Sequence, residues 1–359
     1  MVQGRQLTLD VVRGTAILLV LLFHFRMPLG VPALDAMLQP VFAVGWIGVD
    51  LFFVLSGFLV GRIILAEAAT PAGLDRSRFF VRRAVRLWPV LFFYLLILWM
   101  LGGGRSWPMI WPVLLHVQNY DAAAPSHLWS LAVEEHFYLA AMLVIPPLLR
   151  RGGHRYVEQF LVAVMLGCLA LRLAALAIHE PLLHLQWQTQ YRLDSLAFGV
   201  LMASTALHRP EVFARFAAKR RLCMAIAMGG VVFLSVAGNG ALRHGIGFTI
   251  AYLASGAFIM ALVDCPIAPA LAWPARRLAA IGLIAYPLYI WHASIGAMVR
   301  TSAASAGIIS PPVVVGGSIA ASVAIAVAMH VLIERPAMRR RNGRRTGPRS
   351  IEATPSPVT

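Results

Sequence analysis

Long apolar runs constrain the fold of this chain more than any other feature of its sequence. A helix needs about 20 apolar residues to cross the hydrocarbon core of a bilayer, and ten stretches approach that length. Hydrophobic residues make up 59% of the chain and charged residues 13%, about half the charged fraction of a soluble domain. We therefore predict an all-α, polytopic membrane bundle of about ten transmembrane helices. The expected helices cover residues 7–25, 41–65, 84–101, 128–149, 157–178, 191–207, 222–238, 246–263, 278–299 and 311–333.

Two further segments complete the predicted organisation. Residues 107–117 are apolar but short and hold two prolines, so we expect an interfacial or re-entrant segment there. Residues 339–359 are basic and then rich in Pro, Ser and Thr, a composition typical of disorder. The sequence thus predicts one membrane domain over residues 1–338 and a disordered cytoplasmic tail over residues 339–359.

The distribution of Lys and Arg predicts the orientation of the bundle. The net charge is +16, and the basic residues gather in alternate connections between the apolar runs. With the N-terminus in the cytoplasm, 24 of the 31 Lys and Arg residues fall on the cytoplasmic side and 5 on the opposite side. This bias follows the positive-inside rule and predicts cytoplasmic N- and C-termini. It accounts for the charge without a nucleic-acid partner.

The first apolar run carries charged groups at costly positions. A charge at mid-membrane costs at least about 2.5 kcal/mol, so each one needs a partner or a function. Arg13 and His24 are 11 residues apart, which places them on one helix face about 16 Å apart along the axis. Asp10 can pair with Arg13 across one turn. Two interpretations stay open: side chains that anchor the two helix ends, or a polar path along the helix.

Other polar side chains interrupt the second and sixth runs. Asp50 has no basic residue near it in the sequence, so its partner must come from another helix. Ser56 stands beside glycines that favour close helix packing. A packing serine is the expected role, and an acyl-accepting nucleophile is the alternative. Arg192 and Asp194 begin the sixth run and form either a surface ion pair or part of a polar site.

A basic cluster lies between the second and third runs, where Arg82, Arg83 and Arg86 follow helical spacing. One interpretation is an anchor beside anionic lipid. The other is a cytoplasmic clamp for the phosphates of a coenzyme A donor. The spacing favours neither.

The fourth run opens with the pair Glu134 and Glu135, two carboxylates for which membrane anchoring is no explanation. His127 precedes Glu134 by seven residues, so both can share a helix face. Trp129 and Tyr138 fit an aromatic belt at the membrane interface. A carboxylate beside a histidine is a pattern that suits proton transfer.

The ninth run repeats polar side chains every three residues at Tyr286, Tyr289 and His292, and Pro287 is expected to kink this helix. With the predicted orientation, most of the singled-out polar residues fall in the outer half of the bundle. We therefore predict a polar channel from the cytoplasm to the outer surface, with a histidine–carboxylate site near its outer end. The outer residues are His24, Asp50, His127, Glu134, Glu135, Arg192, Asp194 and His292.

Six segments in this order resemble the acyltransferase-3 family of bacterial integral membrane acyltransferases, over roughly residues 7–336. They are LDVVRG with the following Arg13 and His24, then GVDLFFVLSGFL, RRAVRLWP, HLWSLAVEEHFYL, YRLDSLAFG and YPLYIWH. The resemblance implies transfer of an acyl group, commonly acetyl, from cytoplasmic acyl-CoA to a hydroxyl of an envelope glycan or another glycoside. It also implies a multi-pass protein of the bacterial inner membrane that uses acyl-CoA as co-substrate without a further cofactor.

Carried over by position, the resemblance assigns roles to individual residues. Arg13 and His24 match the family's signature pair, and Glu134–Glu135 match its paired-glutamate motif. We expect His24 to act as general base, with Glu135 or Glu134 orienting it, and Arg13 to hold the donor or stabilise an oxyanion. A two-step route in which His24 or Ser56 carries the acyl group stays open. The expected acyl-CoA clamp is Arg82, Arg83 and Arg86, and the expected substrate-binding residues are Asp10, Asp50, Ser56, His127, Trp129, Arg192, Asp194, Tyr289 and His292.

A proton-coupled secondary transporter or flippase is the alternative function. It would also use intramembrane His, Asp and Glu as proton relays, but transporters often contain repeated halves, and the sequence shows none. No spacing of Cys or His in the sequence predicts a metal site.

Overall fold

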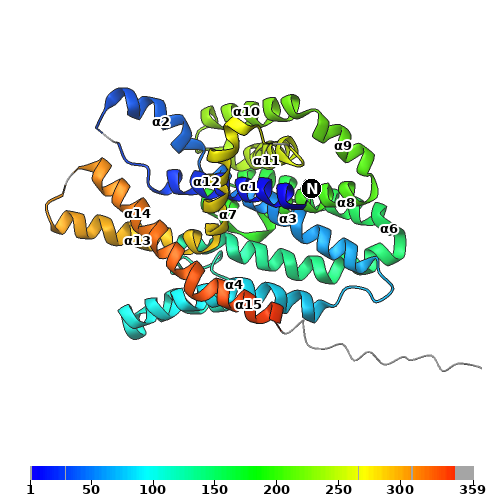
Figure 1. The fold of residues 1–359 in the computed structure, drawn as a ribbon, viewed down its shortest axis with the longest axis horizontal. Helices are drawn as coiled ribbons and strands as arrows, with labels where there is room; N and C mark the ends of the chain where they lie inside the picture. The colour runs from blue at the N-terminus through cyan, green and yellow to red at the C-terminus, as the bar shows by residue number, and fades with distance from the viewer. Residues whose placement is uncertain (1, 29, 266, 309, 344–359) are drawn as a thin grey trace, which may run out of the picture.

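The computed structural model describes residues 2–28, 30–265, 267–308 and 310–343, and this part of the chain consists of helices joined by turns (Figure 1). The predicted all-α class is confirmed. The α-helices are α1 (Val2–His24), α2 (Pro32–Val44), α3 (Ile47–Ala68), α4 (Arg76–Gly102), α5 (Trp107–Leu114), α6 (Trp129–Ala177), α7 (Leu182–Trp187), α8 (Leu193–His208), α9 (Pro210–Ala218), α10 (Arg220–Val236), α11 (Phe248–Leu262), α12 (Pro269–Leu283), α13 (Ala285–Ser305), α14 (Pro311–Met329) and α15 (Arg335–Gly343). Short 3-10 or π segments are η1 (Gly103–Ser106), η2 (Ser126–Leu128), η3 (Thr189–Tyr191), η4 (Arg243–Gly247) and η5 (His330–Glu334).

Six stretches of the described chain are long and apolar enough to cross a membrane, or seven when the bent pair α12–α13 counts as one span. This supports a multi-pass protein but does not confirm ten spans. The difference has structural causes: α8 has 16 residues and α10 has 17, and α6 joins two predicted spans in one stretch. The cytoplasmic location of both termini stays a prediction.

Two breaks fall where the sequence holds glycine or proline. α6 contains a kink at Gly152 and Gly153, and Gly153 has φ +64°, a left-handed value that glycine adopts most easily. α12 and α13 are bent by 71° at Ile284. Pro287 lies four residues after Leu283, where its ring would clash with the Leu283 carbonyl of a continuous helix. The predicted proline kink is therefore a complete break between two helices.

Glycines allow two helix pairs to pack closely around the interior. A Cβ added at Gly57 of α3 or at Gly199 of α8 would overlap a backbone carbonyl of the facing helix. The same holds for Gly14 of α1 and Gly282 of α12. Small residues at such crossings are typical of membrane helix packing. The predicted small-residue surface beside Ser56 is confirmed.

Two clusters of buried apolar side chains flank the polar interior. One joins α3, α6 and α8, and the other joins α1, α4, α13 and α14; Figure 1 shows α13 and α14 side by side. Val49 and Phe52 of α3 pack against both clusters. The junction of the two clusters is where polar side chains enclose a cavity.

The predicted tail falls only partly within the described residues. α15 continues to Gly343, so residues 339–343 are helical, while residues 344–359 lie outside the described part of the chain.

Candidate active site

Two neighbouring cavities contain most of the polar residues that the sequence singled out. The first, which we call the basic cavity, has a volume of about 180 Å³ and is lined by Arg13, Arg83 and Arg86 among others. The second, which we call the imidazole cavity, has a volume of about 140 Å³ and is lined by His24 and His127 among others. Val49 lines both. The structure thus separates the residues that were expected to form one site.

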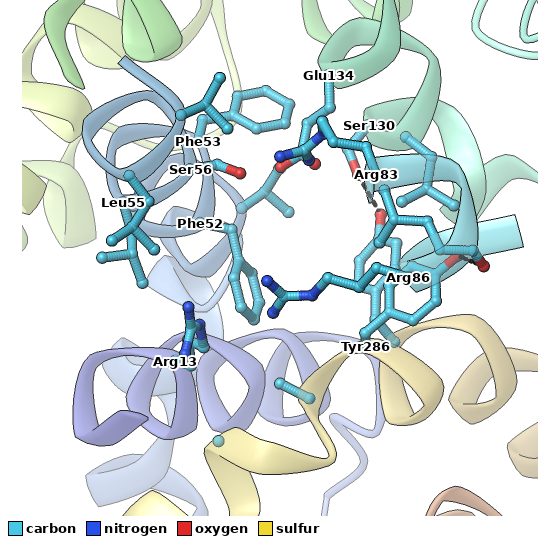
Figure 2. A pocket seen from close by; sticks show the side chains of 18 of the residues that line it. Arg13, Phe52, Phe53, Leu55, Ser56, Arg83, Arg86, Ser130, Glu134 and Tyr286 are labelled. Carbon is cyan, nitrogen blue, oxygen red and sulfur yellow. Dashed lines mark hydrogen bonds between the residues drawn. The ribbon is translucent and has the colours of Figure 1, made fainter. Parts of the chain in front are cut away.

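The basic cavity takes its arginines from two helices. Figure 2 shows Arg83 and Arg86 of α4 and Arg13 of α1 projecting toward one hollow. Arg13 also pairs with Asp10 at 2.5 Å, as predicted. Asp10 is therefore held by Arg13, and it is not among the residues that line either cavity.

Arg82 does not join this cluster. Its guanidinium pairs with Glu67, near the end of α3, at 2.7 Å, and Arg82 is not among the residues that line the basic cavity. The three arginines occupy successive angles around α4, and Glu67 is available on the side where Arg82 projects. The prediction that all three clamp one ligand is therefore wrong for Arg82 and fits the geometry of Arg83 and Arg86.

A chain of hydroxyl groups connects Ser56 to Glu134 at one wall of the basic cavity. The Tyr138 hydroxyl donates to Oε2 of Glu134 at 3.0 Å and shares a hydrogen bond with Ser56. The Arg83 guanidinium lies 3.5 Å from the centre of the Tyr138 ring. Tyr138 is buried, so its predicted place in an interfacial aromatic belt is wrong.

The adjacent glutamates separate in the structure. Glu134 lines the basic cavity, and Glu135, about 100° further around α6, does not. Glu135 is half-buried. A second acidic residue of the basic cavity, Glu334, comes from η5 and pairs with His330 at 2.8 Å.

His24 is presented to the imidazole cavity with a defined tautomer. Its Nδ1 lies 2.9 Å from the carbonyl oxygen of Val20. Because a carbonyl only accepts, the ring proton sits on Nδ1 and the lone pair on Nε2. His24 lies at the end of α1 and is exposed onto the cavity that it lines. Nε2 is therefore a base that is held in position and open to a ligand.

A second histidine, His292, contacts this ring, and a third, His127, contacts His292. The His24 and His292 ring centres are 4.7 Å apart, and those of His127 and His292 are 5.5 Å apart. His292 is fully buried, donates from Nδ1 to the Tyr289 carbonyl at 2.7 Å, and leaves Nε2 without a hydrogen-bond partner. His127 donates from Nε2 to the Ile290 carbonyl at 2.9 Å.

Tyr289 ties this cluster to α6. Its hydroxyl donates to the His127 carbonyl and shares a hydrogen bond of 2.6 Å with Ser130. Tyr289 and Ser130 also line the basic cavity. These contacts hold the two cavities in a fixed relation to each other.

The expected pairing of His24 with Glu134 or Glu135 is not formed. Among the described residues, the His24 ring bonds to the Val20 carbonyl, and the Glu134 carboxylate accepts from the hydroxyls of Tyr138 and Ser56. His127 lies in η2, just before α6, and Glu134 lies seven residues further on in α6, about 10 Å along the helix axis. His127 therefore reaches the imidazole cavity while Glu134 reaches the basic cavity.

Buried ion pairs account for the other charged residues. Asp50 pairs with Arg192 at 2.8 Å, so the partner does come from another helix as predicted. Asp194 pairs with Arg172 at 2.6 Å, so the suggested pair of Arg192 with Asp194 is wrong. All four side chains are buried. Of these four, Arg192 lines the imidazole cavity, and the two aspartates hold helices together.

The imidazole cavity also contains residues that the sequence did not single out. Trp46, Trp187, Gln186 and Arg243 line it together with Trp129. Trp129 is buried, so its predicted position in an aromatic belt is wrong. Apart from Trp129, which begins α6, these residues come from the turn before α3, from the short helix α7 and from η4, where no periodic pattern marks them. Within the described residues no cluster of His, Cys, Asp and Glu could hold a metal ion.

Comparison with known families identifies the class of this fold and site. A family model described as an acyltransferase domain, the acyltransferase-3 model, matches residues 6–331. The chain belongs to the acyltransferase-3 family, as its sequence motifs suggested.

Its curated relatives include O-acetyltransferases. The chain is 28% identical over 281 residues to the O-acetyltransferase OatA of Staphylococcus aureus strain NCTC 8325, covering 69% of this chain and 45% of that protein. It is 25% identical over 216 residues to a putative O-acetyltransferase of Staphylococcus aureus strain COL, covering 54% of this chain and 34% of that protein. The chain thus spans less than half the length of these relatives. No solved structure matches this chain.

Proposed function

We propose that this protein is a membrane-bound O-acyltransferase that moves an acyl group, in our proposal acetyl, from acyl-CoA to a hydroxyl of a glycan or glycoside. We place it in the inner membrane of a bacterium, with both termini in the cytoplasm and an envelope polysaccharide as the acceptor. The observation that carries the proposal is the pair of adjoining cavities, one rich in arginine and one presenting the free Nε2 of His24. The names of the relatives support acetyl as the group.

The basic cavity is the proposed donor site. Coenzyme A carries several phosphate charges, and guanidinium groups bind phosphate with charge-assisted hydrogen bonds. Arg86 points into the hollow, and Arg83 is held above the Tyr138 ring. Arg13 belongs to this donor site, because it lies about 16 Å from His24 along α1. It therefore holds the donor in this proposal, and the alternative of an oxyanion contact beside His24 is dropped.

The imidazole cavity is the proposed site of chemistry. The phosphates would sit at Arg83 and Arg86, and the extended pantetheine arm of coenzyme A would carry the thioester past Val49 toward His24. Val49 is the residue that lines both cavities. This arrangement places the donor and acceptor on opposite sides of one catalytic histidine, which suits transfer across a membrane.

The proposed step is direct transfer with general-base catalysis. Nε2 of His24 accepts the proton of the acceptor hydroxyl as the oxygen attacks the thioester carbonyl. The C–S bond then breaks, the coenzyme A thiolate takes up the proton from Nε2 of His24, and the free thiol leaves toward the cytoplasm. The Val20 carbonyl, and not a glutamate, orients the imidazole through Nδ1–H. No carboxylate is required beside His24 in this scheme.

The experiment compares two histidine variants of the purified full chain. His24→Ala should lower acetyl transfer from acetyl-CoA by about 100-fold or more, the range of a lost general base. His154→Ala is the matched control, because His154 lines neither cavity and stacks on His208. Free thiol release and mass spectrometry of the glycans report the reaction. Normal transfer by the His24 variant would refute the assignment, and acetyl-CoA left unconsumed by the wild-type protein would favour a transporter.

A further inference from the structure

The imidazole cavity combines aromatic faces with polar hydrogen-bonding groups. Trp46, Trp129 and Trp187 line it from three different parts of the chain, and Gln186 adds an amide. Indole rings offer flat apolar faces with a polar edge, a surface that suits the C–H face of a sugar ring. This composition agrees with a glycan acceptor beside His24.

Arg243 gives the cavity an unusual charge. Its side chain is only 5% exposed, lies 4.3 Å from the centre of the Trp46 ring, and donates from Nη1 to the Asn239 amide oxygen at 2.7 Å. Its Nε has no hydrogen-bond partner. Within the described chain, no carboxylate forms an ion pair with Arg243, whereas Arg172 and Arg192 each have one.

A buried guanidinium without a counter-ion destabilises the fold, and a bound anion would remove that cost. Arg192, the other arginine of this cavity, is neutralised by Asp50, so the charge of Arg243 remains. Arg243 also begins the π-helix η4, and π-helical turns occur frequently at functional sites because they redirect side chains. The position, the charge and the unused Nε–H together indicate a ligand group that carries negative charge.

We propose that the acceptor is an anionic sugar and that Arg243 binds its carboxylate or phosphate while the three tryptophans contact the ring. This inference rests on the proposed function, because it takes the imidazole cavity as the acceptor site. Arg243 is then a specificity-determining residue that selects the acceptor and takes no part in proton transfer. It distinguishes charged from neutral glycans that present the same hydroxyl groups.

The test is a binding measurement that needs no turnover. Tryptophan fluorescence of the purified full chain is titrated with methyl β-glucuronide, glucose 6-phosphate and neutral methyl β-glucoside, each to 100 mM, at matched ionic strength. For the wild-type protein we expect at least one charged sugar to bind at least tenfold more tightly than the glucoside. Tenfold corresponds to about 1.4 kcal/mol. Arg243→Gln should remove this preference, and Arg243→Lys should keep part of it.

Arg105→Gln serves as the matched control, because Arg105 is exposed and lines neither cavity. Equal binding of the charged and neutral sugars to the wild-type protein, no binding of any of them, or a preference that survives in Arg243→Gln would overturn the proposal. Elution of each variant as a monodisperse protein shows that a loss of binding is not a loss of folding. Acyl transfer itself is tested separately by His24→Ala, so a failure here would remove the anionic acceptor and leave the transferase assignment intact.

Discussion

Arg86 and Arg82 lie on the same basic motif, yet the structure predicts opposite results when each is replaced by glutamine. Arg86 projects into the basic cavity (Figure 2), whereas Arg82 pairs with Glu67 outside it. A hydrogen bond to a charged group contributes about 1.5–3 kcal/mol. Removal of Arg86 should therefore weaken acetyl-CoA binding by about 10- to 150-fold. Removal of Arg82 breaks a partly exposed ion pair worth about 0–1 kcal/mol and should change donor binding by less than about threefold.

The assay is steady-state acetyl transfer by the purified variants at varied acetyl-CoA, with equilibrium binding of the donor measured in parallel. A truncated donor, acetyl-pantetheine, lacks the nucleotide and diphosphate. The Arg86→Gln effect should disappear with this donor, because its missing phosphates are the groups that Arg86 is proposed to bind. An equal loss with both donors would refute phosphate recognition by Arg86, and a larger effect from Arg82→Gln would refute the division of the motif.

Three further predictions concern the packing around the two cavities. Gly199→Ala should lower stability by about 1–3 kcal/mol, because its Cβ would overlap the backbone of α3; Gly167→Ala, with open space around it, should change the melting temperature little. Asp50→Asn should destabilise the fold by about 3–5 kcal/mol by leaving Arg192 buried without its counter-ion, and denaturant titration in detergent measures the loss; a near-neutral variant would contradict the buried pair. Tyr138→Phe should cost about 1–3 kcal/mol by removing one hydrogen-bond donor from the buried Glu134 carboxylate, and unchanged thermal stability would show that the bond is not formed.

The sequence predicted the helical class and which polar residues lie inside the bundle, but it predicted few of the pairs that these residues form. Apolar run length and glycine spacing are local properties, so the helices and the close packing at Gly57 followed from them. Spacing placed Arg82, Arg83 and Arg86 within about 100° of one another around α4, but it could not show that Arg82 pairs with Glu67 instead of joining the basic cavity. The pairing of Asp194 with Arg172 could not be predicted either, because both residues lie within apolar runs and the choice depends on how α6 and α8 pack.

The division of the site into two cavities could not be predicted from residue spacing along the chain. Seven residues separate His127 in η2 from Glu134 in α6, which gives them a similar angle but places them about 10 Å apart in depth, and that depth decides which cavity each one lines. The break at Ile284 similarly moves α13, with Tyr289 and His292, relative to a continuous helix. Arg243 gave no signal because its proposed role depends on its burial and on the absence of an ion-paired carboxylate in the described structure.

The central claim is that one donor molecule extends from the basic cavity to His24. An electron cryo-microscopy structure of the full chain with a thioether analogue of acetyl-CoA, which cannot transfer its acyl group, tests it most directly. We predict the diphosphate beside Arg83 and Arg86 and the acyl carbonyl within the imidazole cavity, next to the Nε2 face of His24. A donor whose acyl end stays in the basic cavity beside Ser56, with His24 out of reach, would contradict direct transfer and point to a different nucleophile.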